Sequence, residues 1–340
     1  AKIGSSGNGA AEPMAVVIHP NGEDAYVANR GGSVAAISGI DGATPEISAE
    51  LDFDGEPVGL ALSPTGGTLY VTNWVSGAVY VIDTDTFTLT QTVDVGLNPY
   101  AIAVTNDGDV DDTDERLFVT EFYGRPEGKE ALDTGRKGIV YTMPTVAPAT
   151  VTEIPLAPLE SCFTGDLGGT VQTTACFPNQ LTGITIHTAF GKTRAYVVSV
   201  GAAPKGPVAF NHNMQANISV IDVDTRLEVP GLARNLNQLV KDQQPDSDGD
   251  DAKGRRFVNM PMGLAFVGNP SIAVGYVAAS GSDILLRVEY DATDNVTVGS
   301  LTNSYLFDFV SGWTYAVCVG VAGGMMLRRR ANGTTSTQRS

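Results

Sequence analysis

The sequence predicts an all-β fold, a β-propeller built from four-stranded blades. Three observations carry this prediction: a segment that recurs along the chain, a spacing between copies that equals one blade, and a turn-rich composition. The 39 glycines and 18 prolines suit many short strands joined by tight turns. The 340 residues could hold two average domains, but closed all-β architectures often use this length for one.

The recurring segment is clearest in its first two copies, which align without a gap. Residues 13–29 read PMAVVIHPNGEDAYVAN and residues 57–73 read PVGLALSPTGGTLYVTN. A third copy opens at Pro99, so the first three copies begin 44 and 42 residues apart, the period of one four-stranded blade. We expect a fourth copy around 181–199 and a fifth over 261–279.

Each copy supplies two strands, and a β-rich run after it supplies a third. A fourth strand is expected in runs such as 89–95. Five blades are clear, and six or seven are expected in the whole ring. The expected third strands are 33–37, 78–83, 138–143, 217–222 and 283–288.

The prediction divides the chain into an N-terminal linker over 1–12, the propeller over 13–302 and an atypical tail over 303–340. The tail carries an apolar run over 310–327, followed by three arginines. Three interpretations stay open: a degenerate blade, a truncated or out-of-frame end, or a membrane anchor with a positive flank.

Three insertions explain the longer intervals between the later copies: residues 123–137, 145–178 and 231–260. Each falls either between the second and third strands of a blade or between one blade and the next. Both kinds of connection lie on one face of a propeller, which we call the entry face. Because loops on a rigid scaffold often carry function, we expect a functional site on the entry face.

The charge of the chain limits its partners. A net charge of −17 and a pI near 4.4 argue against nucleic acid, whose binding needs clustered Lys and Arg. Acidic balance suits either cation binding or solubility. A membrane partner is expected only through the tail, and the chain is expected to be a monomer.

The cysteines predict a disulfide between Cys162 and Cys176, which are 14 residues apart, and the alternative is two unpaired thiols. Cys318 is expected to be free or blocked. A disulfide implies an oxidising compartment. The sequence begins without a visible export signal, and we expect that one has been removed. The chain is therefore expected to be secreted, periplasmic or on the cell surface.

Two acidic clusters predict calcium sites, because alternating carboxylates can converge hard oxygen ligands on one ion. The cluster over 246–251 resembles the start of an EF-hand loop but lacks its closing Glu, and the alternative is a solvated acidic loop. The cluster over 107–115 lies between the inner and second strands of the third blade, away from the long insertions. The predicted ligands are Asp246, Asp248, Asp250, Asp251, Asp107, Asp109, Asp111, Asp112, Asp114 and Glu115.

Candidate catalytic residues are sparse. The chain has three histidines, and His212 alone falls in a predicted entry-face loop, where it could transfer protons. His19 and His187 share one repeat position at a strand end and are expected to be structural. Glu121 and Tyr123 follow the second strand of the third blade and are expected near the same funnel. No Gly-x-Ser-x-Gly elbow or Gly-Lys-Ser/Thr phosphate loop occurs.

The segments Leu69–Asn73 (LYVTN) and Ala25–Asn29 (AYVAN) resemble the YVTN-repeat propeller family, and the repeats are similar to those of lactonase-type propellers. The resemblance covers about residues 13–290 and implies a secreted or surface-exposed protein. It leaves two functions open. One is a calcium-dependent hydrolase of lactones or related esters, in which calcium polarises a carbonyl and His212 or Glu121 activates water. The alternative is a non-enzymatic, calcium-stabilised propeller that binds a protein or surface ligand.

Overall fold

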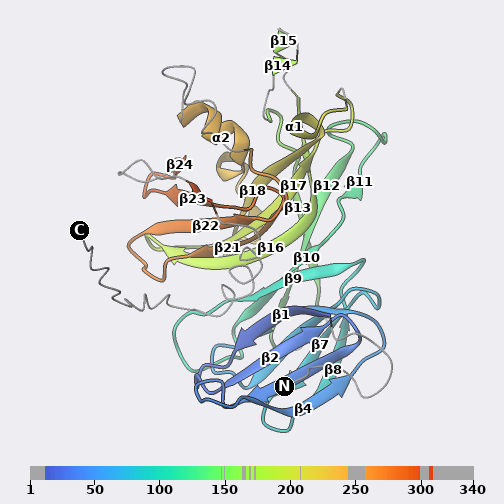
Figure 1. The fold of residues 1–340 in the computed structure, drawn as a ribbon, viewed down its shortest axis with the longest axis vertical. Coiled ribbons are helices and arrows are strands. Elements are labelled where there is room, and N and C mark those ends of the chain that lie inside the picture. The colour runs from blue at the N-terminus through green and yellow to red at the C-terminus, as the bar shows by residue number, and fades with distance from the viewer. Residues whose placement is uncertain are drawn as a thin grey trace, which may run out of the picture.

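The structure is a computed structural model that describes residues 12–146, 148, 150–162, 166–167, 170–171, 174–206, 208–243, 257–298 and 306–308. Its described residues form an all-β propeller of five antiparallel blades, each with four strands paired in chain order (Figure 1). The predicted fold class is confirmed.

Blade 1 holds β1 (Pro13–Ile18), β2 (Asp24–Asn29), β3 (Ser33–Ser38) and β4 (Glu46–Asp52). Blade 2 holds β5 (Pro57–Leu62), β6 (Thr68–Asn73), β7 (Ala78–Asp83) and β8 (Thr88–Asp94). Blade 3 holds β9 (Pro99–Val104), β10 (Arg116–Glu121), β12 (Arg136–Pro144) and β13 (Thr152–Leu156), with β11 (Arg125–Pro126) paired to β12.

Blade 4 holds β16 (Phe177–Ala189), β17 (Lys192–Ala202), β18 (Met214–Asp222) and β19 (Leu227–Glu228), with β20 (Arg234–Asn235) paired to β18. Blade 5 holds β21 (Pro261–Phe266), β22 (Ala273–Ala279), β23 (Ile284–Tyr290) and β24 (Val296–Val298), with β25 (Leu306–Asp308) paired to β23. The insertions contribute β14 (Asp166–Leu167), β15 (Thr170–Val171), a 3-10 turn (Pro230–Leu232) and α2 (Leu236–Gln243), and the connection between β17 and β18 contributes α1 (Phe210–Asn213).

The repeated sequence forms the second strand of each blade because that strand is buried on both faces. In β2, β6 and β10 every residue after the first is buried, and Val, Tyr and Phe suit such positions. Glycine at position 59 permits close approach of the next blade, since a Cβ there would overlap the carbonyl oxygen of Tyr100. The predicted strands are confirmed within a few residues at each end.

The inner strands pack in succession, β1 on β5, β5 on β9, β9 on β16 and β16 on β21. Among the described residues no comparable contact joins β21 to β1, so these five blades form an arc. Threonine hydroxyls link neighbouring blades. Thr72 donates to the carbonyl oxygen of Tyr100 at 2.6 Å, and Thr120 donates to that of Leu181 at 2.9 Å.

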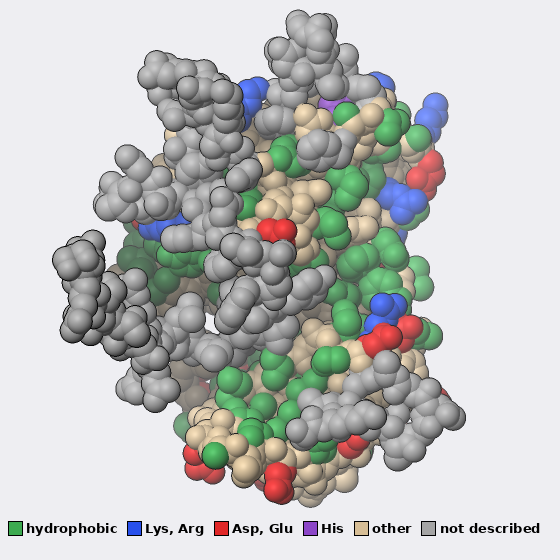
Figure 2. Space-filling view, viewed as in Figure 1, with side chains coloured by type: hydrophobic (Ala, Val, Ile, Leu, Met, Phe, Trp, Pro, Cys, Tyr) green, Lys and Arg blue, Asp and Glu red, His purple; other side chains and the backbone are tan. Residues whose placement is uncertain are grey.

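The insertions gather around the entry-face end of blade 4, where Figure 1 shows α1, α2, β14 and β15 above the sheet. The side chain of Asn217 in β18 contacts Cys176 from one insertion and Asn235 from another. On the face drawn in Figure 2, acidic side chains lie along the lower edge, over the first blades, and apolar side chains occupy more of the middle.

Two terminal predictions fall largely outside the described residues. These are the linker and the tail, of which only Glu12 and the strand β25 are described. The predicted anchor and the unpaired Cys318 lie beyond them. Within the part of the chain that the structure describes, no helix is long and apolar enough to cross a membrane.

Candidate functional site

A groove of about 230 Å³ opens on the entry face where blades 1, 2 and 3 meet. Most of its lining comes from two positions of the repeat. One is the second residue of the inner strand, and the other is the residue that follows the second strand. The lining residues are Met14, Val58, Tyr100, Arg30, Trp74 and Phe122, joined by Glu56 and Tyr123.

A backbone hydrogen bond repeated in blades 1, 2 and 3 brings these two positions together. The N–H after the second strand donates to the carbonyl oxygen of the residue before the inner strand. This bond fixes one end of each blade, so equivalent side chains of three blades converge at the axis. The pairs are Arg30 to Glu12 at 2.9 Å, Trp74 to Glu56 at 2.8 Å and Phe122 to Asn98 at 3.0 Å.

Four aromatic rings form the blade 2 and blade 3 side of the groove. Phe122 is the centre of this cluster, and its ring centroid lies 4.9 Å from those of Trp74, Tyr100 and Tyr123. Most of these pairs are edge-to-face, the arrangement that the ring quadrupole favours. The side chain of Tyr123 is 46% exposed, so the cluster presents aromatic surface to solvent.

An ion pair forms the blade 1 side of the groove. Nε of Arg30 lies 2.7 Å from Oε2 of Glu56, and the hydrogen bond between them raises the pKa of Arg30. Both side chains are partly exposed, so the pair contributes little to folding stability. It places a fixed set of donors and acceptors beside the aromatic cluster.

Asn73 holds the turn that presents Trp74. Its Oδ1 accepts the N–H groups of Val75 and Ser76 at 3.2 and 3.1 Å, and its Nδ2 donates to the hydroxyl of Tyr80 at 3.2 Å. This is the side-chain-to-backbone bonding by which Asn stabilises turns. The Asn of the repeat is therefore a structural residue beneath the groove.

Glu121 occupies the same repeat position in blade 3, and its predicted place in the funnel is corrected by the structure. The side chain is 3% exposed and does not line the groove. Its carboxylate accepts hydrogen bonds from Arg125 at 2.6 Å and from the hydroxyl of Tyr141. Burial and the neighbouring Glu121 raise the pKa of Tyr141. Tyr123, by contrast, lies in the groove as expected.

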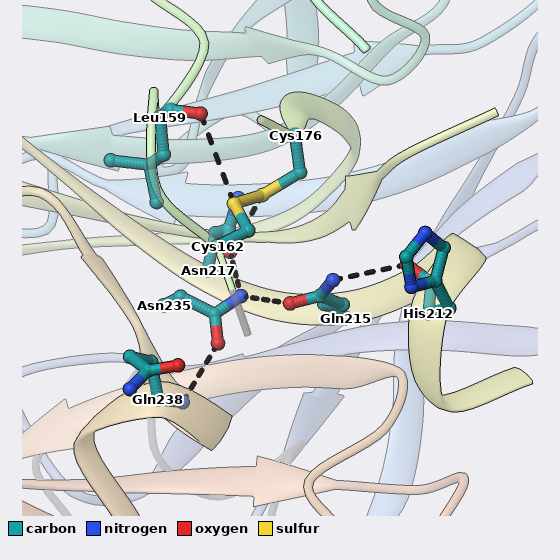
Figure 3. Close-up of a disulfide and its surroundings, with 8 residues drawn as sticks. All are labelled: Leu159, Cys162, Cys176, His212, Gln215, Asn217, Asn235 and Gln238. Atoms are coloured by element: carbon teal, nitrogen blue, oxygen red, sulfur yellow. Dashed lines mark hydrogen bonds between the residues drawn. A yellow bond between two sulfur atoms is a disulfide. The ribbon is translucent and has the colours of Figure 1, made fainter. Parts of the chain in front are cut away.

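His212 also differs from its predicted environment. It lies in the short helix α1 and is 0% exposed, and among the described residues neither ring nitrogen has a hydrogen-bond partner. Figure 3 shows it beside Gln215, whose Nε2 donates to the backbone oxygen of His212 at 3.0 Å. The expectation of a surface-loop histidine is wrong, because the connection between β17 and β18 folds into a short helix in which His212 is buried. His212 and Glu121 share no hydrogen bond.

The other two histidines make local contacts away from the groove. His187 packs on Phe266 with ring centroids 4.6 Å apart, and its Nε2 lies 2.8 Å from the carbonyl oxygen of Ile272. Nδ1 of His19 accepts the N–H of Asn21 at 3.2 Å.

Only part of the predicted calcium cluster between β9 and β10 converges. Carboxylate oxygens of Asp107, Asp114 and Glu115 lie within 4.8 Å of one another. Burial and the nearby charge of Asp107 raise the pKa of Asp114, as expected for crowded carboxylates. Asp109, Asp111 and Asp112 do not belong to this group. Asp109 accepts the N–H of Asp111, Asp111 accepts that of Thr113, and Asp112 accepts that of Thr65. Within the group, Asp107 also accepts the N–H of Asp109 at 3.1 Å, and Glu115 accepts that of Asp107 at 2.9 Å. The second predicted site, Asp246, Asp248, Asp250 and Asp251, lies outside the described residues.

The predicted disulfide is present at the entry-face end of blade 4. Cys162 and Cys176 are joined, with their Cα atoms 5.9 Å apart. Below it lies a buried amide network, in which Nδ2 of Asn235 donates to Gln215 at 2.7 Å and to Asn217 at 3.0 Å (Figure 3). This end of the propeller is closed by packing, unlike the groove.

Most of the groove was not predicted from sequence. Arg30, Glu56, Val58 and Tyr100 lie at or next to the ends of strands, whereas the predicted site rested on the long loops. The available signal was the repeat itself. Aligned copies place Arg30, Trp74 and Phe122 at one position, and a propeller brings equivalent positions together at its axis.

No protein-family model matches this chain, and no curated protein sequence matches it. The YVTN-repeat resemblance therefore stays a prediction. Among solved structures, hydrazine synthase of Kuenenia stuttgartiensis is 16% identical, with 82% of this chain and 77% of that chain covered and a TM-score of 0.48.

The β-propeller domain of Swd1 from Myceliophteria thermophila is 10% identical, with 85% and 68% covered and a TM-score of 0.48. A structure of a nidogen/laminin complex contains a chain that is 13% identical, with 88% and 84% covered and a TM-score of 0.46. Likenesses this weak say nothing of function. The sheets themselves identify the chain as a β-propeller with five described four-stranded blades.

Proposed function

We propose that this chain is a non-enzymatic binding propeller whose ligand site is the groove between blades 1, 2 and 3. The observation that supports the proposal is the exposed aromatic cluster next to the Arg30–Glu56 ion pair. Concave sites that combine aromatic walls with a few fixed polar groups are typical of ligand binding. Aromatic side chains also supply much of the binding energy at recognition surfaces.

The rim of the groove extends this surface. Val75 follows Trp74 in the turn after β6 and is 64% exposed, and Leu97, next to Asn98, is 70% exposed. The two residues are near each other along the chain of contacts, because Nδ2 of Asn98 donates to the backbone oxygen of Trp74 at 3.4 Å. Exposed apolar side chains beside a groove support an interaction site there.

The hydrolase suggested by the sequence is the other candidate, and no specific contact favours it. The two predicted proton-transfer groups do not line the groove. Glu121 accepts hydrogen bonds from Arg125 and Tyr141, and His212 is buried in the connection between β17 and β18. Proton transfer requires a group within hydrogen-bond reach of the substrate. Hydrolysis therefore remains a prediction, which the experiment below also tests.

Binding at the groove can be tested without a known ligand. We would record NMR spectra of the full chain with four neutral ring fragments: tetrahydropyran, cyclohexanol, indole and δ-valerolactone. We expect shift changes at Trp74 and Tyr123, and their loss in Tyr123→Ala. The matched control is Phe190→Ala, an exposed aromatic residue in the hairpin between β16 and β17. Absence of any fragment from the groove would refute the proposal, and steady hydrolysis of δ-valerolactone would replace it with the hydrolase.

We further propose that calcium binds Asp107, Asp114 and Glu115 and stabilises the turn between β9 and β10. Millimolar calcium should raise the melting temperature by several degrees through binding to the folded state. Asp114→Asn should abolish that rise, and Asp111→Asn should keep it, because Asp111 bonds to Thr113 outside the three-residue cluster. Equal responses of the two variants would refute this site.

The Cys162–Cys176 disulfide supports a further part of the proposal, namely that the protein works in an oxidising compartment, as a secreted, periplasmic or cell-surface protein.

A further inference from the structure

The size of the groove limits its ligand to one ring-sized unit. Its volume of about 230 Å³ is below the roughly 300–1,000 Å³ of pockets that enclose drug-sized molecules. Val58 is buried at its base, while Tyr123 remains largely exposed. A ligand therefore inserts one ring and continues into solvent, which suits a terminal unit of a larger molecule.

The charge of the groove favours a neutral ligand. The charged side chains of its lining are Arg30 and Glu56, and they neutralise each other at 2.7 Å. Among the described lining residues, no uncompensated charge is left to attract a phosphate, a carboxylate or an ammonium group. The net charge of −17 also disfavours anionic ligands at long range.

The groove has a polar side and an aromatic side, so a ring-sized ligand that fits it needs one polar and one apolar surface. The Arg30–Glu56 pair offers donors and acceptors side by side, which suits neighbouring hydroxyl groups. Trp74 and Tyr123 line the other side, and aromatic rings in a binding site suit a surface of polarised C–H bonds. A pyranose ring carries both, since its hydroxyls point outward and its axial C–H bonds form an apolar face.

We propose, on the basis of the proposed function, that the groove binds a neutral pyranose unit of a carbohydrate. A polyproline peptide is the main competitor, because it also stacks on aromatic side chains. Such a peptide advances about 9 Å per turn and needs a longer succession of pockets. The single ring-sized groove favours the sugar.

The experiment follows the fluorescence of Trp74. The chain has two tryptophans, and Trp313→Phe leaves Trp74 as the sole one. The probes are methyl glycosides of glucose, galactose, mannose and N-acetylglucosamine, with sorbitol as an acyclic control. At least one glycoside should give saturable binding with a millimolar dissociation constant, and sorbitol should give none. Calorimetry on the unmodified chain serves as a second measurement.

Matched variants locate the binding. Tyr123→Ala and Glu56→Gln should each weaken the bound glycoside about tenfold or more, and Phe190→Ala should leave its affinity unchanged. If ring fragments occupy the groove but no glycoside does, the ligand class is wrong while the proposed function stands. Binding of a tetraproline peptide in place of the sugars would also overturn the inference, as would glycoside binding that survives Tyr123→Ala.

Discussion

Blades 2 and 4 contain copies of the same repeat, but their entry-face ends differ in structure. In blade 2 the second strand ends at Asn73, and Trp74 turns into an open groove. In blade 4 the equivalent strand β17 continues past Ser199 to Ala202, and Val200 is buried. The disulfide and the amide network then cover that end. One repeat position can thus line an open groove or be buried by packing, depending on what covers that end of the blade.

The largest expected effect comes from opening the covered end. Replacing both Cys162 and Cys176 with Ser should lower the free energy of unfolding by about 3 kcal/mol, because the unfolded chain regains the freedom of a loop of about 14 residues. Urea unfolding measures the loss. The fluorescence of Trp74 in the folded state should not change. A changed Trp74 environment would show that the cover of blade 4 also shapes the groove.

The strands of both ends and the disulfide of the covered end could be predicted from sequence. The burial of His212 could not, and the groove can be recognised only by comparing the copies of the repeat. Strands such as β6 are buried on both faces, which requires an apolar run in the local sequence. The segment around His212 has no such periodicity, and the His212 ring is buried against Gly206 of the same connection. The groove is assembled from single positions of three copies, where Arg30, Trp74 and Phe122 differ in type, so no local motif marks it.

The next effect concerns the joint between blade 3 and the covered blade 4. The carboxylate of Glu228 in β19 accepts the N–H of Ala157 at 2.8 Å, and burial raises the pKa of Glu228 to about 7. The unfolded chain binds fewer protons at this group between pH 4.5 and 7, so the free energy of unfolding falls as pH rises through that range. The free energy of unfolding should fall by on the order of 2 kcal/mol in total, and this loss should level off above pH 7.

Glu228→Gln tests this, because the amide oxygen keeps the bond to Ala157 without a charge. The variant should be more stable than the parent at pH 8 and similar to it at pH 4.5, as measured by urea unfolding at both values. Glu160→Gln is the control, because Glu160 is exposed and lies in the insertion 145–178, which also contains Ala157. A difference between parent and Glu228→Gln that does not change with pH would contradict the assigned protonation.

The smallest effect tests how blade 3 is held beside the groove. Thr72 donates to the carbonyl oxygen of Tyr100 at 2.6 Å, whereas the hydroxyl of Thr142 in β12 is buried without a partner. Both residues are fully buried in strands, so Thr→Val changes the same atoms at each site. Thr72→Val should lower the free energy of unfolding by about 1 kcal/mol, because it leaves the Tyr100 carbonyl with one bond fewer.

Thr142→Val should be neutral within about 0.5 kcal/mol or slightly stabilising, because no hydrogen bond is lost there. The ring of Tyr100 lies 5.8 Å from that of Trp74, so loosening this strand should also shift Trp74 emission in Thr72→Val and not in Thr142→Val. Equal destabilisation by both substitutions would mean that the hydroxyl of Thr72 adds nothing beyond packing. Unchanged Trp74 emission in Thr72→Val would mean that the aromatic cluster itself stabilises the groove. In that case the packing of Phe122, and not the hydrogen bond between the blades, holds Trp74 and Tyr100 together.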